Sequence, residues 1–435
     1  MAPIVRLLTR ALAIAAAVGA LGSPVRAGNE ALLLIDAETG KVLQAENATY
    51  PWYPASTSKL MTTYVTLAAV KSGRITMDTL LTVSPNAVAQ TPSKLGFRAG
   101  VTVTVDNALK MLLVHSANDI AVVLAEGVSG SIEKFADEMN ATSQRLGMTQ
   151  SSWVNPNGLP AEGQISSARD LGILARALMH DFPEWDFYWH IPAIKFGRRV
   201  MVNYNKLLAE YPGADGMKTG FICSSGFNLV ASATRNNRRL IAVVLGAPSG
   251  AVRTQKAAAL LERGFASTSL SWLLPSLGTV DALAPINAAP PDLHEQICGP
   301  HHKRPRGEDE ADDAVVAGSD NNDQQRAFML SDLKGATKAA LLTGNPLAAG
   351  PPVVVFTGAK KPTGSGEAEA DAATLKASKK HAKAKADKAG DKAKAADAKA
   401  DSAKSSGAKT SSAKTSAPKT AQAKPAKPKV APTTQ

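Results

Sequence analysis

The sequence is poor in the residues that build metal-bound or disulfide-stapled proteins. It has two cysteines, Cys223 and Cys298, in 435 residues, too few for a disulfide scaffold but enough for one bridge in an oxidising compartment. Cys223 could be a small core residue, a thiol nucleophile or half of such a bridge, and no neighbouring residue would activate it as a nucleophile. No cysteines and histidines share the spacing of a zinc site, and the pair His301-His302 stands alone in a polar stretch. The sequence therefore predicts neither a metal ion nor another cofactor.

Arginine and aromatic residues are absent from the C-terminal part of the chain. Residues 360–435 contain 18 Lys, no Arg and 7 acidic residues, and no Phe, Trp or Tyr follows Phe356. This segment carries +11 of the net charge of +12, so the basic balance gives no reason to expect a nucleic acid as partner. Lysines repeated among Ala, Ser, Thr and Pro predict a disordered cationic tail over residues 358–435. Its candidate partner is an anionic envelope surface, bound less tightly as salt rises.

No apolar run near the N-terminus is long enough to cross a membrane. The run Ala11–Leu21 has 11 residues, whereas a spanning helix needs about 20. Arg6 and Arg10 precede it, and Val25-Arg26-Ala27 follows with the small-x-small pattern of a cleavage site. Residues 1–27 are therefore predicted to be a signal peptide, with the mature protein in the periplasm and without a membrane anchor.

Residues 28–270 have the patterns of one folded domain. Helical patterns follow an N-terminal hairpin around Glu38-Thr39-Gly40, and strand patterns dominate after Val200. This order predicts an α+β fold, an antiparallel β-sheet with helices packed on it. Residues 271–357 are expected to be an irregular linker region with isolated apolar runs. The expected helices are Ser56–Lys71, Ala108–His115 capped by Asp106, Ile120–Glu126, Ile132–Leu146, Ala168–Met179 and Ala251–Phe265, and the expected strands are Ala31–Asp36, Lys41–Gln44, Val101–Val105, Phe227–Ala233 and Leu240–Leu245.

Ser56 stands three residues before Lys59 at the head of a predicted helix. This spacing puts both side chains on one face of the helix, where a hydroxyl and an amine can act as nucleophile and base. The lysine can serve only in its neutral form, which needs its pKa lowered from about 10.4 toward 7–8 by burial or a second cation. Five further Ser-x-x-Lys pairs occur in the chain, so the pattern alone is weak: they are Ser131/Lys134, Ser331/Lys334, Ser406/Lys409, Ser411/Lys414 and Ser416/Lys419.

Two further motifs distinguish Ser56 from the other five serines. Ser116-Ala117-Asn118 and Lys218-Thr219-Gly220 follow Ser56-Thr57-Ser58-Lys59 in the chain. In this order the three motifs resemble those of the penicillin-recognising serine acyltransferases. Longer strings make residues 28–266 similar to the low-molecular-mass D-alanyl-D-alanine carboxypeptidases, whose fold is β-lactamase/transpeptidase-like. These strings are His115–Asp119, Val154-Asn155-Pro156-Asn157-Gly158-Leu159, Ser166–Asp170 and Gly213–Gly220.

The resemblance implies a role for each motif. Ser56 is the acylated nucleophile, Lys59 its base and Ser116 a proton relay toward the leaving amine. Asn118 binds the substrate amide. Lys218, the candidate second cation, and Thr219 bind the terminal carboxylate by charge-assisted hydrogen bonds, and Gly220 allows close approach. The backbone N–H groups of Ser56 and Phe221 form the oxyanion hole.

The activity implied is removal of the terminal D-Ala from peptidoglycan stem peptides, with β-lactams as covalent inhibitors. A D,D-endopeptidase that cuts cross-links has the same motifs and stays open. A serine β-lactamase is disfavoured because Glu162 lies in a string that matches the carboxypeptidases. From another class, the chain could be an envelope-binding protein that acts through its cationic tail.

Overall fold

The computed structural model describes residues 30–266, 276–300 and 350–360. The predicted signal peptide, His301-His302 and residues 361–435 of the predicted tail lie outside these ranges. Within them, no helix combines the length and apolarity that a membrane span requires.

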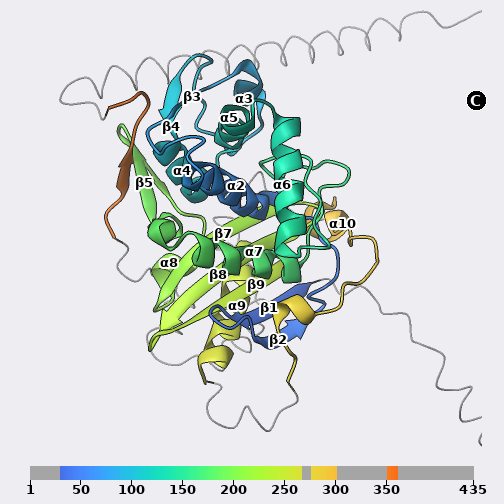
Figure 1. Ribbon diagram of the computed structural model, residues 1–435. Helices are drawn as coiled ribbons and strands as arrows, with labels where there is room; N and C mark the ends of the chain where they lie inside the picture. Colours follow the sequence, from blue (N-terminus) through green and yellow to red (C-terminus); the bar gives the residue numbers. More distant parts are fainter. Residues whose placement is uncertain (1–29, 267–275, 301–349, 361–435) are drawn as a thin grey trace, which may run out of the picture. The chain divides into compact units, whose positions relative to one another are not determined.

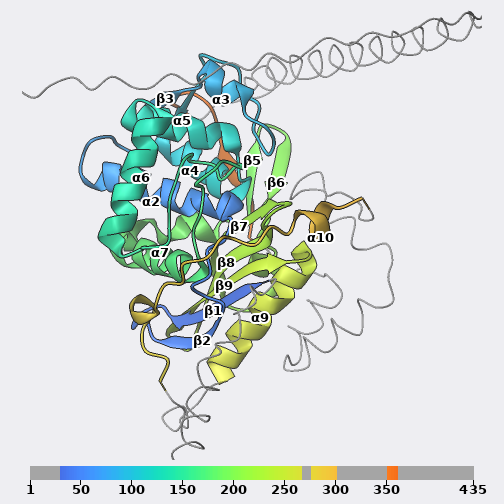
Figure 2. The ribbon, with the colours of Figure 1, turned by 90° about the vertical axis from the view of Figure 1, so that its right-hand side faces the viewer.

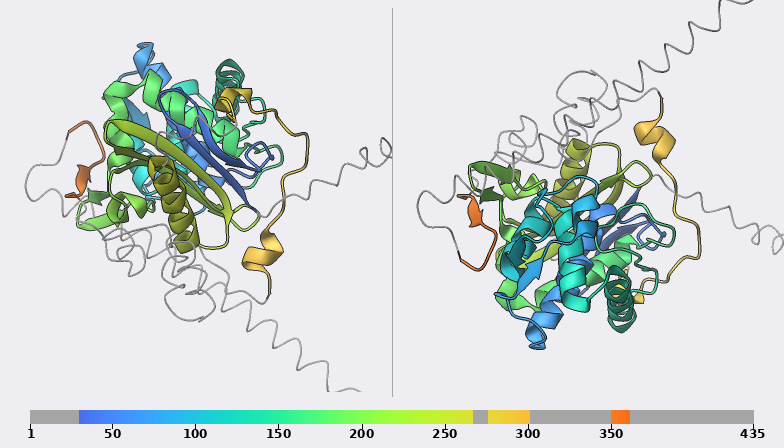
Figure 3. Two further views of the ribbon diagram at one scale, coloured as in Figure 1. Left: turned by 90° about the horizontal axis from the view of Figure 1, so that it is seen from below. Right: turned by 90° about the horizontal axis from the view of Figure 1, so that it is seen from above.

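A five-stranded antiparallel sheet lies at the centre of the fold (Figure 1), in the order β2-β1-β9-β8-β7. Helix α9 (Gly250–Ala266) packs on β8 and β9, and α7 (Ala168–Asp181) packs on β9 and β1. Figures 2 and 3 show α9 and α7 on opposite faces of the sheet. The predicted α+β fold is therefore confirmed. The strands are β1 (Ala31–Asp36), β2 (Val42–Glu46), β7 (Ala214–Ile222), β8 (Gly226–Arg235) and β9 (Arg238–Ala247).

Helix α2 (Lys59–Lys71) lies at the centre of the helical layer and has ten of its 13 residues buried. Its buried threonines satisfy their hydroxyl groups on backbone carbonyls, as when Thr62 Oγ1 donates to Pro156 O at 2.6 Å. This packing fixes the N-terminus of α2, where Lys59 stands. The other elements of this layer are η1 (Ala55–Ser58), β3 (Leu80–Thr82), α3 (Pro85–Ala89), β4 (Thr102–Thr104), α4 (Val105–Val114), α5 (Asn118–Ser129) and α6 (Ile132–Leu146).

The prediction that Asp106 caps the helix leading to His115 is wrong. The helix begins earlier, and the Thr104 side chain accepts the hydrogen bond from the Asn107 backbone N–H at 3.2 Å. Asp106 lies in the first turn instead, where its charge is also favourable. Thr104 is the last residue of β4 and the N-cap of α4. Threonine and aspartate are both common N-cap residues, so the sequence pattern did not distinguish Thr104 from Asp106.

Residues 276–300 run from the β1–β2 hairpin to the end of β7, and we call this segment the belt. Val42, the first residue of β2, donates its N–H to Gly278 O of the belt at 2.9 Å. Further along, Leu293 N–H donates to Ser224 O at 3.0 Å. Cys298, in the short helix α10 (His294–Cys298), is bonded to Cys223. Figure 2 shows the belt in gold, running from beside β2 to α10 near the end of β7. The disulfide is thus the correct one of the three interpretations of Cys223.

Residues 350–360 form a second segment, after the belt, that attaches to the folded domain. Strand β10 (Val353–Val355) pairs in parallel with β5 (Ala193–Phe196), which pairs with β6 (Arg199–Val202). The apolar run predicted there is therefore a strand. It is held to the helical layer as well, because Gly358 N–H donates to Thr102 O at 2.8 Å. The elements between α7 and β7 are completed by η2 (Pro183–His190) and α8 (Leu207–Glu210).

Removing the disulfide is expected to destabilise the folded domain. The bridge joins residues 75 positions apart, and closing a loop of that length restricts the unfolded chain by about 4 kcal/mol. The double variant Cys223→Ser/Cys298→Ser should therefore unfold at a clearly lower urea concentration than the oxidised wild type. Wild type measured with a reducing agent is the control and should match the variant. Equal midpoints for oxidised and reduced protein would contradict the bridge.

Candidate active site

Ser56 and Lys59 meet at the junction between η1 and α2. The predicted helix begins as a 3-10 turn, in which side chains three residues apart eclipse each other. Lys59 Nζ donates to Ser56 Oγ at 2.8 Å, to Asn118 Oδ1 at 2.8 Å and to Asn157 O at 2.7 Å. Lys59 is fully buried, and burial disfavours a charged amine.

This geometry suits a base for Ser56. An ammonium group has three donors, and all three are directed at acceptors here. When Lys59 is neutral, its two N–H groups can still donate hydrogen bonds to Asn118 Oδ1 and Asn157 O. Its lone pair then faces Ser56 Oγ and can accept the hydroxyl proton. The two asparagine contacts thus orient the amine for proton transfer.

The backbone just before Ser56 is held in an uncommon conformation. Ala55 has φ of 49°, in the left-handed region that non-glycine residues rarely adopt. Gly158 packs on it so closely that a Cβ at that position would lie 1.8 Å from Ala55 O. Gly158 also has a positive φ of 81°, so only glycine fits there. This contact supports the turn that presents Ser56.

Ser116-Ala117-Asn118 connects α4 to α5, as the sequence predicts, although Asn118 is already the first residue of α5. Ser116 has a positive φ of 55° and is 2% exposed. In the described parts of the chain, its Oγ has no hydrogen-bond partner. An unpaired buried hydroxyl costs about 1–3 kcal/mol. A binding site repays that cost when the ligand supplies the missing partner.

The loop between α3 and β4 holds Asn118 in place. Asn118 N–H donates to Ser93 O at 2.8 Å, and its Nδ2 donates to Thr91 O at 2.9 Å. The neighbouring Asp119 accepts the backbone N–H of Gly96 at 2.9 Å. Burial raises the pKa of the Asp119 carboxyl despite these backbone hydrogen bonds. Asp119 therefore anchors the loop, and the loop in turn fixes the amide that contacts Lys59.

Lys218 and Thr219 lie on β7, the edge strand of the sheet that packs against η1. Both are 1% exposed. Lys218 Nζ donates to Thr219 O at 2.9 Å. Among the described residues Thr219 Oγ1, like Ser116 Oγ, has no hydrogen-bond partner. A buried amine beside an unpaired hydroxyl suits an anionic group such as a carboxylate.

Gly220 is the point at which β7 meets the nucleophile turn. A Cβ at Gly220 would lie 2.9 Å from both Ser56 N and Thr57 N. This close approach brings the backbone of Gly220 and Phe221 beside the Ser56 N–H. The Phe221 ring stacks on the Phe227 ring, with centroids 4.2 Å apart. The Ser56 N–H and the β7 backbone at Gly220 are therefore neighbours in the site.

Asn157 is a site residue absent from the residues chosen on sequence. Its carbonyl accepts from Lys59, and its Nδ2 donates to Gln90 Oε1 at 2.9 Å. It lies in the string from Val154 to Leu159 that carries the family resemblance, so the signal was present. Any residue type can supply a backbone carbonyl, however, so the sequence gives no sign of this contact.

His115 is packed, as expected from its place in an apolar helical run. Its side chain is 8% exposed, and its Nδ1 lies 3.1 Å from the Tyr204 hydroxyl.

Comparison with known proteins identifies the family. Residues 20–249 match the sequence profile of a family described as D-alanyl-D-alanine carboxypeptidase. The chain belongs to this family. The match covers the three motifs, η1 and the whole of β7 and β8 and confirms the resemblance expected from the sequence.

Individual members of the D-alanyl-D-alanine carboxypeptidase family agree. The chain is 38% identical over 242 residues to D-alanyl-D-alanine carboxypeptidase DacC of Escherichia coli, which is 54% of this chain and 60% of that protein. It is 35% identical over 250 residues to DacA of Haemophilus influenzae, covering 56% of this chain and 64% of the relative. The solved structure of penicillin binding protein 5 from Haemophilus influenzae matches with a TM-score of 0.53 and 36% identity, covering 54% of this chain and 70% of that one. The matched region thus spans less than two thirds of the length of both named carboxypeptidases.

Proposed function

We propose that this chain is a serine-type D-Ala-D-Ala carboxypeptidase that removes the terminal D-Ala of peptidoglycan stem peptides. The observation that carries the proposal is the 2.8 Å contact between Ser56 Oγ and the fully buried Lys59 Nζ. Membership of the carboxypeptidase family supports the substrate class. The terminal carboxylate would be bound by Lys218 and Thr219, and Asn118 would contact the peptide amide through its second Nδ2 hydrogen.

In the first half of the reaction, Ser56 Oγ attacks the carbonyl carbon of the penultimate D-Ala while Lys59 takes the hydroxyl proton. The carbonyl oxygen becomes negative and is stabilised by the N–H groups of Ser56 and Phe221. The C–N bond then breaks, Ser116 passes a proton to the leaving amine, and free D-Ala departs. The product is an ester between Ser56 and the shortened peptide.

In the second half, a water molecule attacks the ester carbonyl and gives up its proton to the same base. The bond between the acyl carbon and Ser56 Oγ breaks, Lys59 returns the proton to Ser56 Oγ, and the shortened peptide leaves as a carboxylate. A β-lactam would acylate Ser56 by the same attack but would keep its ring remnant in the site. That remnant would block the water, which accounts for covalent inhibition.

The D,D-endopeptidase alternative shares every one of these groups and differs in its substrate. Purified protein should be incubated with a stem pentapeptide and, in parallel, with cross-linked sacculi. The proposal expects release of free D-Ala from the pentapeptide, with the dimeric muropeptides left intact. Loss of the dimers without D-Ala release would favour the endopeptidase, and rapid penicillin turnover without a lasting adduct would favour a β-lactamase.

The periplasm is the proposed compartment, supported by the predicted signal peptide and by the disulfide. The cationic tail is proposed to bind an anionic envelope surface. Deleting residues 361–435 should then reduce retention on envelope fractions at low salt and change nothing at high salt. Equal retention of both forms at low salt would remove this role.

A further inference from the structure

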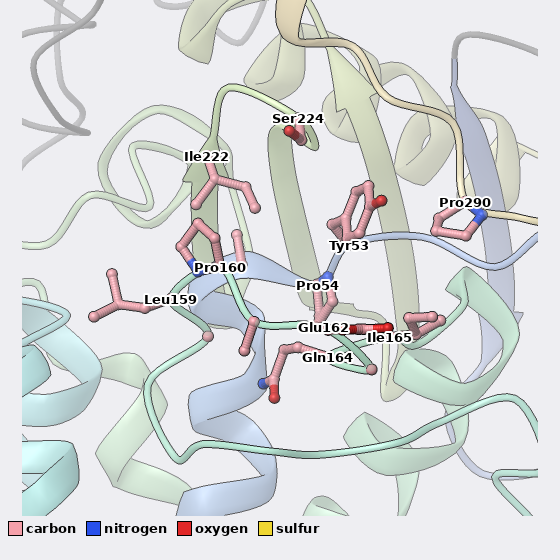
Figure 4. Close-up of a pocket in the computed structure, with 14 residues that line it drawn as sticks. Tyr53, Pro54, Leu159, Pro160, Glu162, Gln164, Ile165, Ile222, Ser224 and Pro290 are labelled. Carbon is pink, nitrogen blue, oxygen red and sulfur yellow. The ribbon is translucent and has the colours of Figure 1, made fainter. Parts of the chain in front are cut away.

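Strand β10 lies outside the region that the family profile matches, and the proposed mechanism does not use it. The profile ends at residue 249, whereas β10 covers Val353–Val355. Figure 1 shows β10 in orange-brown beside β5. The hollow of about 510 Å³ beside the nucleophile turn is lined by other segments (Figure 4), and no residue of β10 touches it. Any effect of β10 on the active site must therefore pass through intervening residues.

The contacts of β10 join two parts of the helical layer. The strand itself pairs with β5 of the β5–β6 hairpin. Just after it, Phe356 N–H donates to Asn107 Oδ1 at 3.1 Å, and Gly358 N–H donates to Thr102 O at 2.8 Å. Asn107 lies near the start of α4, and Thr102 is on β4. Residues 353–358 thus hold the hairpin against β4 and α4.

The two faces of this small sheet differ in burial. Val355 is 1% exposed and pairs with Phe196, which is 9% exposed. Val354 pairs with Lys195, and both are only half-buried. Successive side chains of a strand point to opposite faces. Val355 and Phe196 therefore share the inner face of the sheet, and Val354 lies on the outer face. Both β5 and β10 contact α4.

The inner face leads to the loop that holds Asn118. The Phe196 ring meets the Phe97 ring edge to face, with centroids 5.2 Å apart. Phe97 is 2% exposed and belongs to the loop between α3 and β4. Two carbonyls of this loop accept the backbone and side-chain N–H groups of Asn118. Asn118 Oδ1 in turn accepts from Lys59 Nζ, so these contacts connect β10 to the proposed base.

A second route runs from the same hairpin toward Ser116. Two residues after β6, the Tyr204 hydroxyl lies 3.1 Å from His115 Nδ1 and 3.4 Å from Ser93 Oγ. His115 directly precedes Ser116, the proposed proton relay. Among the described residues, no strand other than β10 pairs with that edge of β5. A hairpin of two strands is only marginally stable by itself, and a third strand stabilises it.

We propose that β10 is a positioning strand for the active site, which fixes the β5–β6 hairpin and, through it, the loop that holds Asn118. Val355 is its positioning residue, because it is buried beside Phe196. For its kinetic readout the inference rests on the proposed acylation of Ser56. Loosening the loop displaces the amide that orients Lys59, so it slows acylation more than it weakens the preceding noncovalent binding.

Two aspartate substitutions on neighbouring positions of β10, made in the full chain, test the proposal. Val355→Asp puts an unpaired carboxylate on the buried face and should detach the strand. Val354→Asp adds the same charge on the outer face and is the matched control. The dependence of acylation on penicillin concentration gives the acylation rate constant and the dissociation constant of the noncovalent complex. Hydrogen exchange at residues 91–97 and 115–119 reports how firmly the loop is held.

Val355→Asp should slow acylation by about tenfold, since small displacements of catalytic groups cost up to about 10²-fold. Its dissociation constant should change less, and exchange in the loop should become faster. Val354→Asp and the conservative Val355→Ile should keep the wild-type values. If Val355→Asp does not fold, Gly358→Pro replaces it. Proline removes the N–H bonded to Thr102 and excludes the φ of 80° at that position, so the same changes are expected.

The outcomes separate this inference from the proposed function. Normal acylation in a folded variant with β10 detached would overturn the positioning role, whether or not exchange is faster, and the carboxypeptidase function would stand. If penicillin does not acylate the wild type, the proposed function fails. Hydrogen exchange then tests β10 alone. Equal exchange of the loop in Val355→Asp and Val354→Asp would overturn its role, and faster exchange in Val355→Asp only would support it.

Discussion

Ser56→Ala is expected to abolish both D-Ala release and covalent binding of penicillin, each by a factor of roughly 10⁴ or more. The substitution removes the oxygen that forms the ester and leaves Lys59 without the hydroxyl it contacts at 2.8 Å. The fold should be retained, because among the described residues Lys59 is the only hydrogen-bond partner of the Ser56 side chain. The loss is measured as the rate of penicillin acylation. Reactions are stopped at set times, and the intact mass of the protein gives the acylated fraction.

Ser131→Ala is the matched control for Ser56→Ala. Ser131 has a lysine three residues later, as Ser56 does, but it is the N-cap of α6 and accepts from Lys134 N–H at 3.2 Å. Its loss should cost about 1 kcal/mol of stability and leave acylation unchanged. An acylation defect in Ser131→Ala, or near-normal acylation in Ser56→Ala, would contradict the assignment.

Lys59→Ala is expected to slow penicillin acylation by about 10²- to 10⁴-fold, the usual contribution of a positioned base. The variant also leaves Asn118 Oδ1 and Asn157 O without their shared donor, so some loss of stability is expected. Lys59→Arg separates the two effects. A guanidinium keeps the positive charge and the donors but does not give up a proton near neutral pH, so it should be as slow as alanine.

Thermal unfolding of each Lys59 variant checks that the measured rate belongs to folded protein. Lys134→Ala provides the control for removing a lysine from a Ser-x-x-Lys pair on the surface, and it should acylate at the wild-type rate. A Lys59→Arg variant with nearly full activity would contradict the role of base. It would then point to an electrostatic role for the side chain, which arginine can fill.

Local sequence patterns were enough to predict most of the core elements. The end residues of α6 and the strand β1 agree with their expected ranges. The hairpin between β8 and β9 also agrees, and its turn residues Asn236 and Asn237 take the positive φ that such turns require. Each of these elements depends on periodicity or on a turn residue, which are properties of neighbouring positions.

Contacts between distant segments were not predictable in the same way. The course of the belt depends on single hydrogen bonds and on one disulfide, and its sequence has no periodic pattern. Strand β10 forms by pairing with β5, more than 150 positions earlier in the chain. A short apolar run does not reveal which strand it will join, because pairing depends on the edge that the rest of the fold leaves open.

The sequence motifs predicted which site side chains would lie together. Ser56, Lys59 and Asn118 are joined by two hydrogen bonds through one nitrogen atom. The carbonyl of Asn157 and the packing of Gly158 on Ala55 came from the structure. They act through the backbone, where residue type says little about position.

Peptide mapping of the protein after exposure to benzylpenicillin shows directly which residue is acylated. Intact mass gives the number of covalent adducts, and fragmentation of the peptide that ends at Lys59 gives their position. We expect one penicilloyl group, located on Ser56 and absent from Ser56→Ala. An adduct on any other residue, or one that persists in Ser56→Ala, would contradict this expectation.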